Sequence, residues 1–216
     1  MAGSTCLSKN AGHMVWGPLE AFTPEDLAAL YDVNVLGTQR VNRAVPPHMR
    51  GARDGLIVWI SSSSVAGGIP PLLGPYFAAK AGMDQLAVSY ARELAPLGIE
   101  TALVVPGAFA KGTNHFAHAG APADAARTAD YARAWPPGFS DALQKALAAT
   151  DPPGSAPGEV GRTVAAIVGT PKGERSSRTV IDPADDGSAV SFAVIDRLRG
   201  QFLHRIGFAE LLHPAP

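Results

Sequence analysis

Two short apolar runs separated by a helical pattern constrain the fold more than any other feature of this sequence. Leu56–Ile60 reads LIVWI and Thr101–Val105 reads TALVV, and neither run contains a charge. Short continuous runs of this kind are typical of strands buried on both faces. Between them, Pro75–Ala95 repeats apolar residues at helical spacing. The order strand, helix, strand predicts a parallel sheet covered by helices.

Further elements extend this unit on both sides. Thr23 is suited to cap a helix that begins at Pro24 and continues toward Met49, where Pro46 and Pro47 should kink or end it. Toward the carboxyl end we expect a helix at Gly158–Val168, a short strand at Thr179–Ile181 and a helical stretch at Ser188–Leu212.

The chain has 216 residues, which suffices for one domain with a sizeable core. We therefore expect a single domain over residues 1–216. Residues 10–107 form its core, and residues 158–216 add the last strand and the carboxyl-terminal helices. Residues 108–157 are rich in Ala, Pro, Gly and His and are typical of a substrate loop or lid.

Charge and polarity exclude some classes of partner. The chain has 18 basic and 19 acidic side chains, so no basic excess is available for binding nucleic acid. Gly55–Ala79 is uncharged and long enough to cross a bilayer, but Pro70 and Pro71 would break the required helix. Cys6 is the single cysteine, and no apolar leader stretch begins the sequence. We expect a soluble, cytoplasmic protein.

Tyr76 and Lys80 are the pair with the clearest chemical potential. They lie four residues apart near a predicted helix start, so both side chains leave the same helix face. A lysine ammonium beside a phenol lowers the phenol's pKa from its usual value of about 10. Tyr76 is therefore a candidate general acid and base. The pair alone is weak support for a catalytic role, because most tyrosine and lysine pairs at this spacing lie on solvated helix faces.

Other motifs give the pair a context. In chain order they are Asn10-Ala11-Gly12, Asn34-Val35-Leu36-Gly37, the serine run Ser61–Ser64, the pair Tyr76 and Lys80, and Pro106-Gly107. From about Asn10 to Asn114, this series resembles the short-chain dehydrogenase/reductase family. The resemblance implies an α/β fold of Rossmann type, with a doubly wound parallel sheet and helices on both faces. It also implies reversible hydride transfer between NAD or NADP and a small secondary alcohol or ketone.

The resemblance assigns catalytic roles to four residues. Tyr76 would exchange a proton with the substrate oxygen, and Lys80 would lower the pKa of the phenol and hydrogen-bond the nicotinamide ribose. Ser63 would stabilise charge on the substrate oxygen. Asn34 would hold a water that links Lys80 to solvent.

For the cofactor, the resemblance implies contacts of Asn10, Ala11 and Gly12 along the adenosine side. Pro106 and Gly107 would line the nicotinamide pocket, with Tyr76 and Lys80 beside them. A family threonine that follows the Pro-Gly pair is displaced in this sequence, where Thr113 is the candidate.

The serine assignment has two solutions. A spacing of thirteen residues before Tyr76 selects Ser63, whereas the pattern Ser-x-x-Gly ending at Gly67 selects Ser64. We prefer Ser63. The remaining serines are expected to hydrogen-bond the backbone at the strand end.

The amino terminus departs from the family pattern. Family members open with a strand, a Gly-rich turn that binds the pyrophosphate, and further strand–helix units before their Asn-Ala-Gly. Here Asn10 is the tenth residue, and the chain contains no G-x-G-x-x-G. We therefore expect the amino-terminal cofactor-binding half to be missing. The residue that separates NAD from NADP would lie in it. Met1–Ser8 could form part of the fourth strand, although it is less apolar than expected.

Two readings of function follow: an active reductase, or a catalytically silent fragment that acts only through packing. Family members pair through helices corresponding to Pro24–Met49 and Pro75–Ala95, so we expect a homodimer or homotetramer.

Two further groups of side chains each have two interpretations. His115 and His118 have a metal-ligand spacing without a third ligand, which favours loop histidines over a metal site. The aromatic residues Tyr131, Trp135 and Phe139 could cap an apolar substrate or serve as packing residues.

Overall fold

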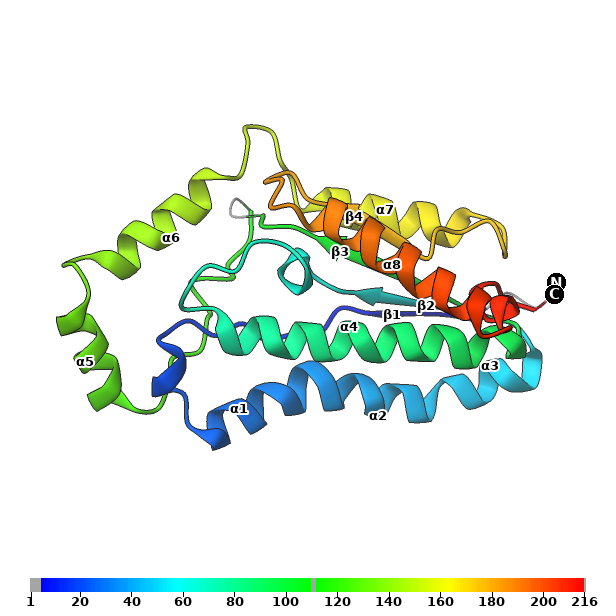
Figure 1. Ribbon diagram of the computed structural model, residues 1–216, viewed down its shortest axis with the longest axis horizontal. Helices are drawn as coiled ribbons and strands as arrows, with labels where there is room; N and C mark the ends of the chain where they lie inside the picture. Colours follow the sequence, from blue (N-terminus) through cyan, green and yellow to red (C-terminus); the bar gives the residue numbers. More distant parts are fainter. Residues whose placement is uncertain (1–4, 110–111, 216) are drawn as a thin grey trace.

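The computed structural model describes residues 5–109 and 112–215, and its centre is a parallel sheet. The four strands lie in the order β1-β2-β3-β4 and are all parallel. Their bounds are β1 Cys6–Lys9, β2 Gly55–Ile60, β3 Ile99–Pro106 and β4 Arg178–Ile181. The predicted strands at residues 56–60, 101–105 and 179–181 are confirmed with slightly wider bounds. Helices cover both faces of the sheet, as expected for an α/β fold of Rossmann type (Figure 1).

Eight α-helices are present among the described residues. They are α1 Pro24–Tyr31, α2 Gly37–Ala44, α3 Pro46–Ala52, α4 Gly74–Leu94, α5 Ala125–Ala134, α6 Phe139–Ala149, α7 Gly158–Gly169 and α8 Ser188–Arg205. A π-helical segment at Asp32–Leu36 joins α1 to α2. None of these helices is both long enough and apolar enough to cross a bilayer.

Helix boundaries follow the local sequence signals. The Thr23 hydroxyl accepts a hydrogen bond from the Asp26 backbone N–H, and the Asp26 carboxylate accepts one from Thr23, so a capping box begins α1. Pro46 occupies the first turn of α3, because a proline lacks the N–H that a helix interior requires. The predicted carboxyl-terminal helix divides into α8 and a 3-10 turn at Ala209–Leu212.

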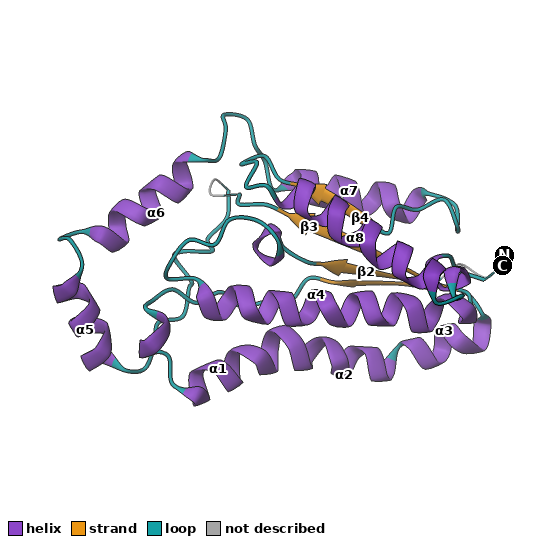
Figure 2. Cartoon of the chain, in the orientation of Figure 1, coloured by secondary structure: helices purple, strands orange, loops and turns teal. Residues whose placement is uncertain are grey.

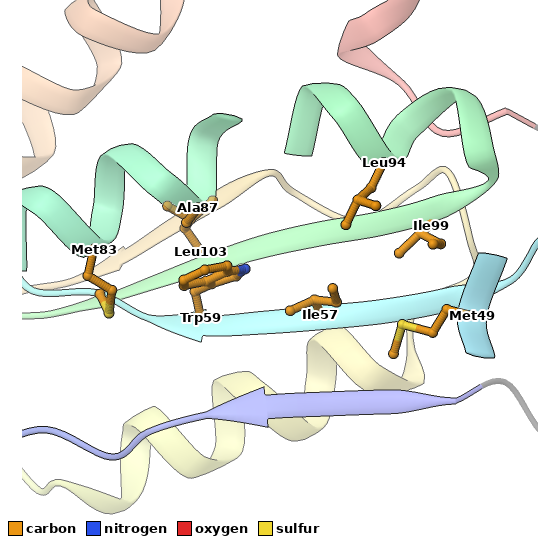
Figure 3. Packing of buried hydrophobic residues seen from close by; sticks show 8 residues of the cluster. All are labelled: Met49, Ile57, Trp59, Met83, Ala87, Leu94, Ile99 and Leu103. Carbon is orange, nitrogen blue, oxygen red and sulfur yellow. The ribbon is translucent and has the colours of Figure 1, made fainter. Parts of the chain in front are cut away.

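Alternate residues of β2 point into two separate cores. Ile57 and Trp59 are fully buried against α4, together with Met83 and Leu94 (Figure 3). Leu56 and Val58 face the opposite side, where Ile167 of α7 packs against them. Burial on both faces explains why the strand sequence is continuously apolar.

At one edge of the sheet, β1 pairs only with β2 among the described residues. Cys6 and Ser8 are not buried, and only Lys9 is. The prediction that Met1–Ser8 contributes to a strand is confirmed from Cys6 onward, whereas residues 1–4 lie outside the described part of the chain. The low apolar content of this strand fits an edge position.

The segment after β3 carries α5 and α6, which lie beyond the carboxyl ends of the strands and apart from the sheet (Figures 1 and 2). Neither helix has a buried residue. The indole Nε1 of Trp16 donates a hydrogen bond of 3.0 Å to Ser140 Oγ and links α6 to the main body. The helices of this segment therefore lie on the side of the molecule to which the carboxyl ends of the strands point.

Candidate active site

Tyr76 and Lys80 occupy successive turns at the beginning of α4. The Lys80 side chain is buried, and its Nζ donates a hydrogen bond of 3.0 Å to the carbonyl oxygen of Ile60, the last residue of β2. Pro75 lies in the first turn, where its fixed φ favours the helix start. The helix start is thereby held against the carboxyl end of the strand, and both side chains face that end of the sheet.

The electrostatic environment of Tyr76 differs from the sequence expectation. We expected Lys80 to lower the pKa of the phenol, but burial raises it above the usual value, and only the Ser62 hydroxyl acts in the opposite direction. Burial disfavours the charged phenolate. The phenol is therefore protonated at neutral pH and is suited to donate a proton.

Each serine of the run has a different partner. Ser61 Oγ donates a hydrogen bond of 2.5 Å to Asp84. Ser62 interacts with Tyr76 and also accepts from the Ser64 backbone N–H at 3.2 Å. Ser63 interacts with the carboxylate of Asp186, and Ser64 Oγ lies 2.8 Å from Ser62 Oγ.

The serine whose hydroxyl interacts with the phenol is Ser62, and the 3-10 turn at Ser63–Val65 begins directly after it. The sequence spacing selected Ser63 instead, and the catalytic role of either serine stays a prediction. The hydroxyl of Ser62 caps this turn while it faces Tyr76. In the sequence, Ser62 is marked only by its position two residues after Ile60, the end of the apolar run that forms β2.

Asn34 lies in the π-helical segment and is buried. Its Oδ1 accepts a hydrogen bond of 2.7 Å from the His13 backbone N–H, and its Nδ2 donates one of 2.8 Å to the His13 carbonyl. The side chain thus fixes the loop after β1 next to Gly12. A water relay from Asn34 to Lys80 stays a prediction.

A cavity of about 650 Å³ opens at the carboxyl ends of β1, β2 and β3. Most of the residues predicted for cofactor binding line it. They are Asn10, Gly12, Tyr76, Lys80, Pro106 and Gly107. Ala11 is exposed and is not among the lining residues. Ser62 lines this cavity, whereas Ser63 does not.

A second cavity of about 390 Å³ shares a wall with the first. The residues common to both are Ser62, Tyr76, Gly107, Phe109, Thr113 and His115. Phe77, Phe116 and Leu147 give the second cavity apolar walls, and Asp185 and Asp186 are among its polar lining residues. Ser62 and Tyr76 therefore lie where the two cavities meet.

The structure separates the loop residues that the sequence grouped together. His115 lines both cavities, whereas His118 lines neither, and burial together with the charge of Lys80 lowers the pKa of His115. The described residues contain no cluster of three metal-ligating side chains. Thr113, the displaced threonine candidate, lines both cavities. Its Oγ1 donates a hydrogen bond of 2.6 Å to the Phe109 carbonyl oxygen.

The aromatic side chains Tyr131, Trp135 and Phe139 contact one another in series, in edge-on and tilted geometry, with centroid separations of 5.1 and 4.8 Å. Trp135 and Phe139 line a third cavity of about 270 Å³ with Trp16, and none of the three aromatic residues lines a cavity that contains Tyr76. Their position therefore favours packing over capping a substrate at Tyr76.

Comparison with known proteins gives matches across the core of the chain. Residues 4–121 match the family model described as short chain dehydrogenase. A 3-ketodihydrosphingosine reductase of Bacteroides thetaiotaomicron is 38% identical over 106 residues, which cover 49% of this chain and 39% of the relative. The chain spans about two fifths of the length of the curated relatives that it matches.

Solved structures extend the similarity to more of the fold. A short-chain dehydrogenase from Streptomyces avermitilis superposes with a TM-score of 0.65 at 25% identity, covering 94% of this chain and 69% of that chain. A metagenomic short-chain oxidoreductase in complex with NADP gives a TM-score of 0.57 at 25% identity, covering 83% of this chain and 62% of that chain.

Proposed function

Because the chain belongs to the short-chain dehydrogenase family, an oxidoreductase family, we propose that it transfers hydride reversibly between NAD or NADP and a secondary alcohol or ketone. One observation carries the proposal: Ser62, Tyr76 and Lys80 line a single cavity at the carboxyl ends of the sheet strands. Ligands of open α/β sheets bind at this end of the strands. The proposal assigns Tyr76 as the general acid and base and Lys80 and Ser62 as its partners.

The residues present fit the nicotinamide end of such a cofactor. A Cβ atom at Gly12 would lie 3.4 Å from Asn34 Oδ1 and 3.8 Å from Lys80 Nζ, so glycine keeps the cavity open beside the lysine. The Lys80 ammonium has three donors, and one of them is used by Ile60. Asn10, Pro106 and Gly107 would complete this part of the site. The cofactor, when bound, would supply or accept the hydride.

The protein's own residues account for the proton. In the direction of ketone reduction, the Tyr76 phenol donates a proton to the carbonyl oxygen. Ser62 donates a hydrogen bond to the same oxygen and stabilises the negative charge that develops there. The positive charge of Lys80 stabilises the phenolate that remains after proton transfer. The apolar walls of the second cavity, including Phe77 and Phe116, would hold the body of a small, largely apolar substrate.

We also propose that the protein is a homodimer or larger. The layer formed by α1, the π-helical segment and α2 exposes Val33 to 45%, Leu36 to 50% and Val41 to 38%. Exposed apolar side chains in one helical layer would suit an interface between two copies of the chain. Light scattering at micromolar concentration should give at least twice the monomer mass of 22.3 kDa, and a monomer would contradict the proposal.

The function is tested by following NADPH and NADH oxidation with a panel of ketones at millimolar nucleotide. Because we expect weak nucleotide binding, the expected result is slow turnover by the unaltered chain and by Lys145→Met, a control that removes an exposed lysine from α6. Lys80→Met should lose activity by about 10²-fold or more, the range of acid–base defects. If the unaltered chain turns over no ketone with either nucleotide, the catalytically silent reading is correct.

A further inference from the structure

Asp84 lies one turn beyond Lys80 in α4 and is only 2% exposed. Its carboxylate accepts hydrogen bonds from three donors. Ser61 Oγ donates at 2.5 Å, and the Arg178 guanidinium donates two bonds, of 2.7 and 3.2 Å. Such paired bonds between arginine and a carboxylate fix the orientation of both groups.

Lys80 and Asp84 hold neighbouring residues at the same strand end. Lys80 donates to the carbonyl of Ile60, and Asp84 accepts from the side chain of Ser61. The next residue, Ser62, is the one that faces Tyr76. Two successive turns of α4 therefore hold Ile60 and Ser61, the two residues directly before Ser62, by hydrogen bonds.

Arg178 extends the cluster to a third element. Arg178 belongs to β4, and its side chain is 6% exposed. Its Nε donates a hydrogen bond of 2.6 Å to Asp196 of α8. Its guanidinium also lies 4.0 Å from the ring centroid of Phe192 in α8. Arg199 Nη1 also lies 3.7 Å from Asp196, so Lys80, Arg178 and Arg199 carry three positive charges against the two negative charges of Asp84 and Asp196. A buried charge that lacks a partner of opposite sign is strongly unfavourable.

We infer that Asp84, clamped by Arg178 and Ser61, is a positioning residue that keeps the Lys80 ammonium charged and aligned at the end of β2. The inference rests on the proposed function only for its consequence, because a neutral Lys80 could not stabilise a phenolate at Tyr76.

The opposing effects at Lys80 support this inference. Burial lowers the pKa of Lys80 from its ordinary value to about 8, and the negative charge of Asp84 acts to raise it. The other titratable groups that face Lys80 are Tyr76 on its own helix and His115 from the loop after β3, whose pKa is itself lowered by burial and by Lys80. Neither group supplies a negative charge at neutral pH. Asp84 is therefore the group that opposes the loss of the proton from Lys80.

The test measures Lys80 directly and requires no turnover. Trace labelling with acetic anhydride as a function of pH, followed by mass spectrometry of the Lys80 peptide, gives the pKa of its amine. The variant is the double substitution Asp84→Asn with Arg178→Met, because removing both members of a buried pair is tolerated better than removing one. The matched control is Asp130→Asn with Arg133→Met, which removes an exposed ion pair from α5.

We expect the unaltered chain and the control to titrate Lys80 near 8 and the double variant lower, by less than Asp84→Asn alone, because the double variant also removes the positive charge of Arg178. A merely structural role predicts the opposite sign, because a loosened helix would hydrate Lys80 and move its pKa toward 10.5. An unchanged or raised pKa in the double variant would overturn the inference. Loss of the proposed activity in all forms, with the lower pKa present, would overturn the function and leave the inference standing.

Single substitutions provide an independent check. Asp84→Asn alone should lower the pKa of Lys80 as well. Asp84→Glu keeps the negative charge, so the pKa of Lys80 in this variant should lie close to that of the unaltered chain. If Asp84→Asn fails to fold, the double variant still decides the question. If Asp84→Glu titrates Lys80 like Asp84→Asn, the charge of the carboxylate is not the cause and the inference fails.

Discussion

The Lys80 ammonium donates a hydrogen bond of 3.0 Å to the carbonyl oxygen of Ile60, and this contact joins the first turns of α4 to the end of β2. The serine run begins at the next residue, so the same contact sets the position of Ser62 relative to Tyr76. A lysine held by the backbone in a buried site keeps a fixed geometry and has a perturbed pKa. The predictions below depend on these two properties.

Substitution of each serine by alanine should distinguish the catalytic role of Ser62 from that of Ser63. Ser62→Ala should reduce kcat/KM for ketone reduction by about 10²-fold, the loss typical of one donor to a developing oxyanion. Ser63→Ala should change it only a few fold, because Ser63 faces Asp186. Initial rates of both variants, with circular dichroism as a control for folding, provide the comparison. A larger loss in Ser63→Ala would return the role to Ser63.

Ketone reduction should decline on the alkaline side of pH 8. The pKa of Lys80 is lowered to about 8, so the ammonium loses its charge as pH rises through that value. The pKa of Tyr76 is raised, so the phenol keeps its proton over the same interval. The measurement is kcat/KM from pH 6 to pH 10 for the unaltered chain and for Lys80→Met. Only the unaltered chain should show the decline, and the same decline in both would show that another group titrates.

Lys9 should limit stability at neutral pH. It is 8% exposed, its Nζ lies 3.4 Å from the centroid of the Trp59 ring, and it donates to Asn42 Oδ1. Burial lowers its pKa from 10.5 to about 7. Between these two values the unfolded chain binds more protons than the folded one, so this lysine makes stability rise with pH.

Lys9→Met should therefore raise Tm at pH 7 by a few degrees and weaken the rise toward pH 10. Thermal unfolding of both forms across this range is the measurement, with Lys145→Met as the exposed control. A lower Tm for Lys9→Met at pH 7 would mean that contact of the ammonium with the ring outweighs its desolvation.

The sequence predicted the fold well because its signals are local. The continuous apolar run at residues 56–60 is a strand buried on both faces, and Thr23 with Asp26 forms the expected cap of α1. Part of the cavity lining lies directly after strand ends, because Asn10 follows β1 and Gly107 follows β3, and the motifs that carry the family resemblance include both residues.

The sequence could not predict features that depend on tertiary packing. Spacing and pattern select Ser63 and Ser64 among the four adjacent serines, whereas the packing around the 3-10 turn after Ser62 brings Ser62 to Tyr76. The effect of burial on Tyr76 is likewise invisible in the sequence, although it exceeds the other influences on the pKa of the phenol. The partnership of Asp84 with Arg178 joins residues 94 positions apart.

The 216-residue chain should bind NADP or NAD with a Kd weaker than about 1 mM. It contains no G-x-G-x-x-G to supply backbone donors to the pyrophosphate. Hydrogen bonds to charged groups contribute about 1.5–3 kcal/mol each, so the loss of two or three weakens binding by roughly 3–9 kcal/mol. The whole binding free energy of a micromolar complex is only about 8 kcal/mol. Isothermal titration with each nucleotide gives the value. A micromolar Kd would show that other residues bind the pyrophosphate.

The most direct test of Tyr76 as the proton donor is the rate of hydride transfer in a single turnover, followed at millimolar NADPH with excess protein over ketone. Tyr76→Phe removes only the phenolic oxygen and keeps the ring packed in its place beside Phe77. The account predicts that this variant transfers hydride at least about 10²-fold more slowly than the unaltered chain at neutral pH. A Tyr76→Phe variant that retains half of the rate or more would contradict it.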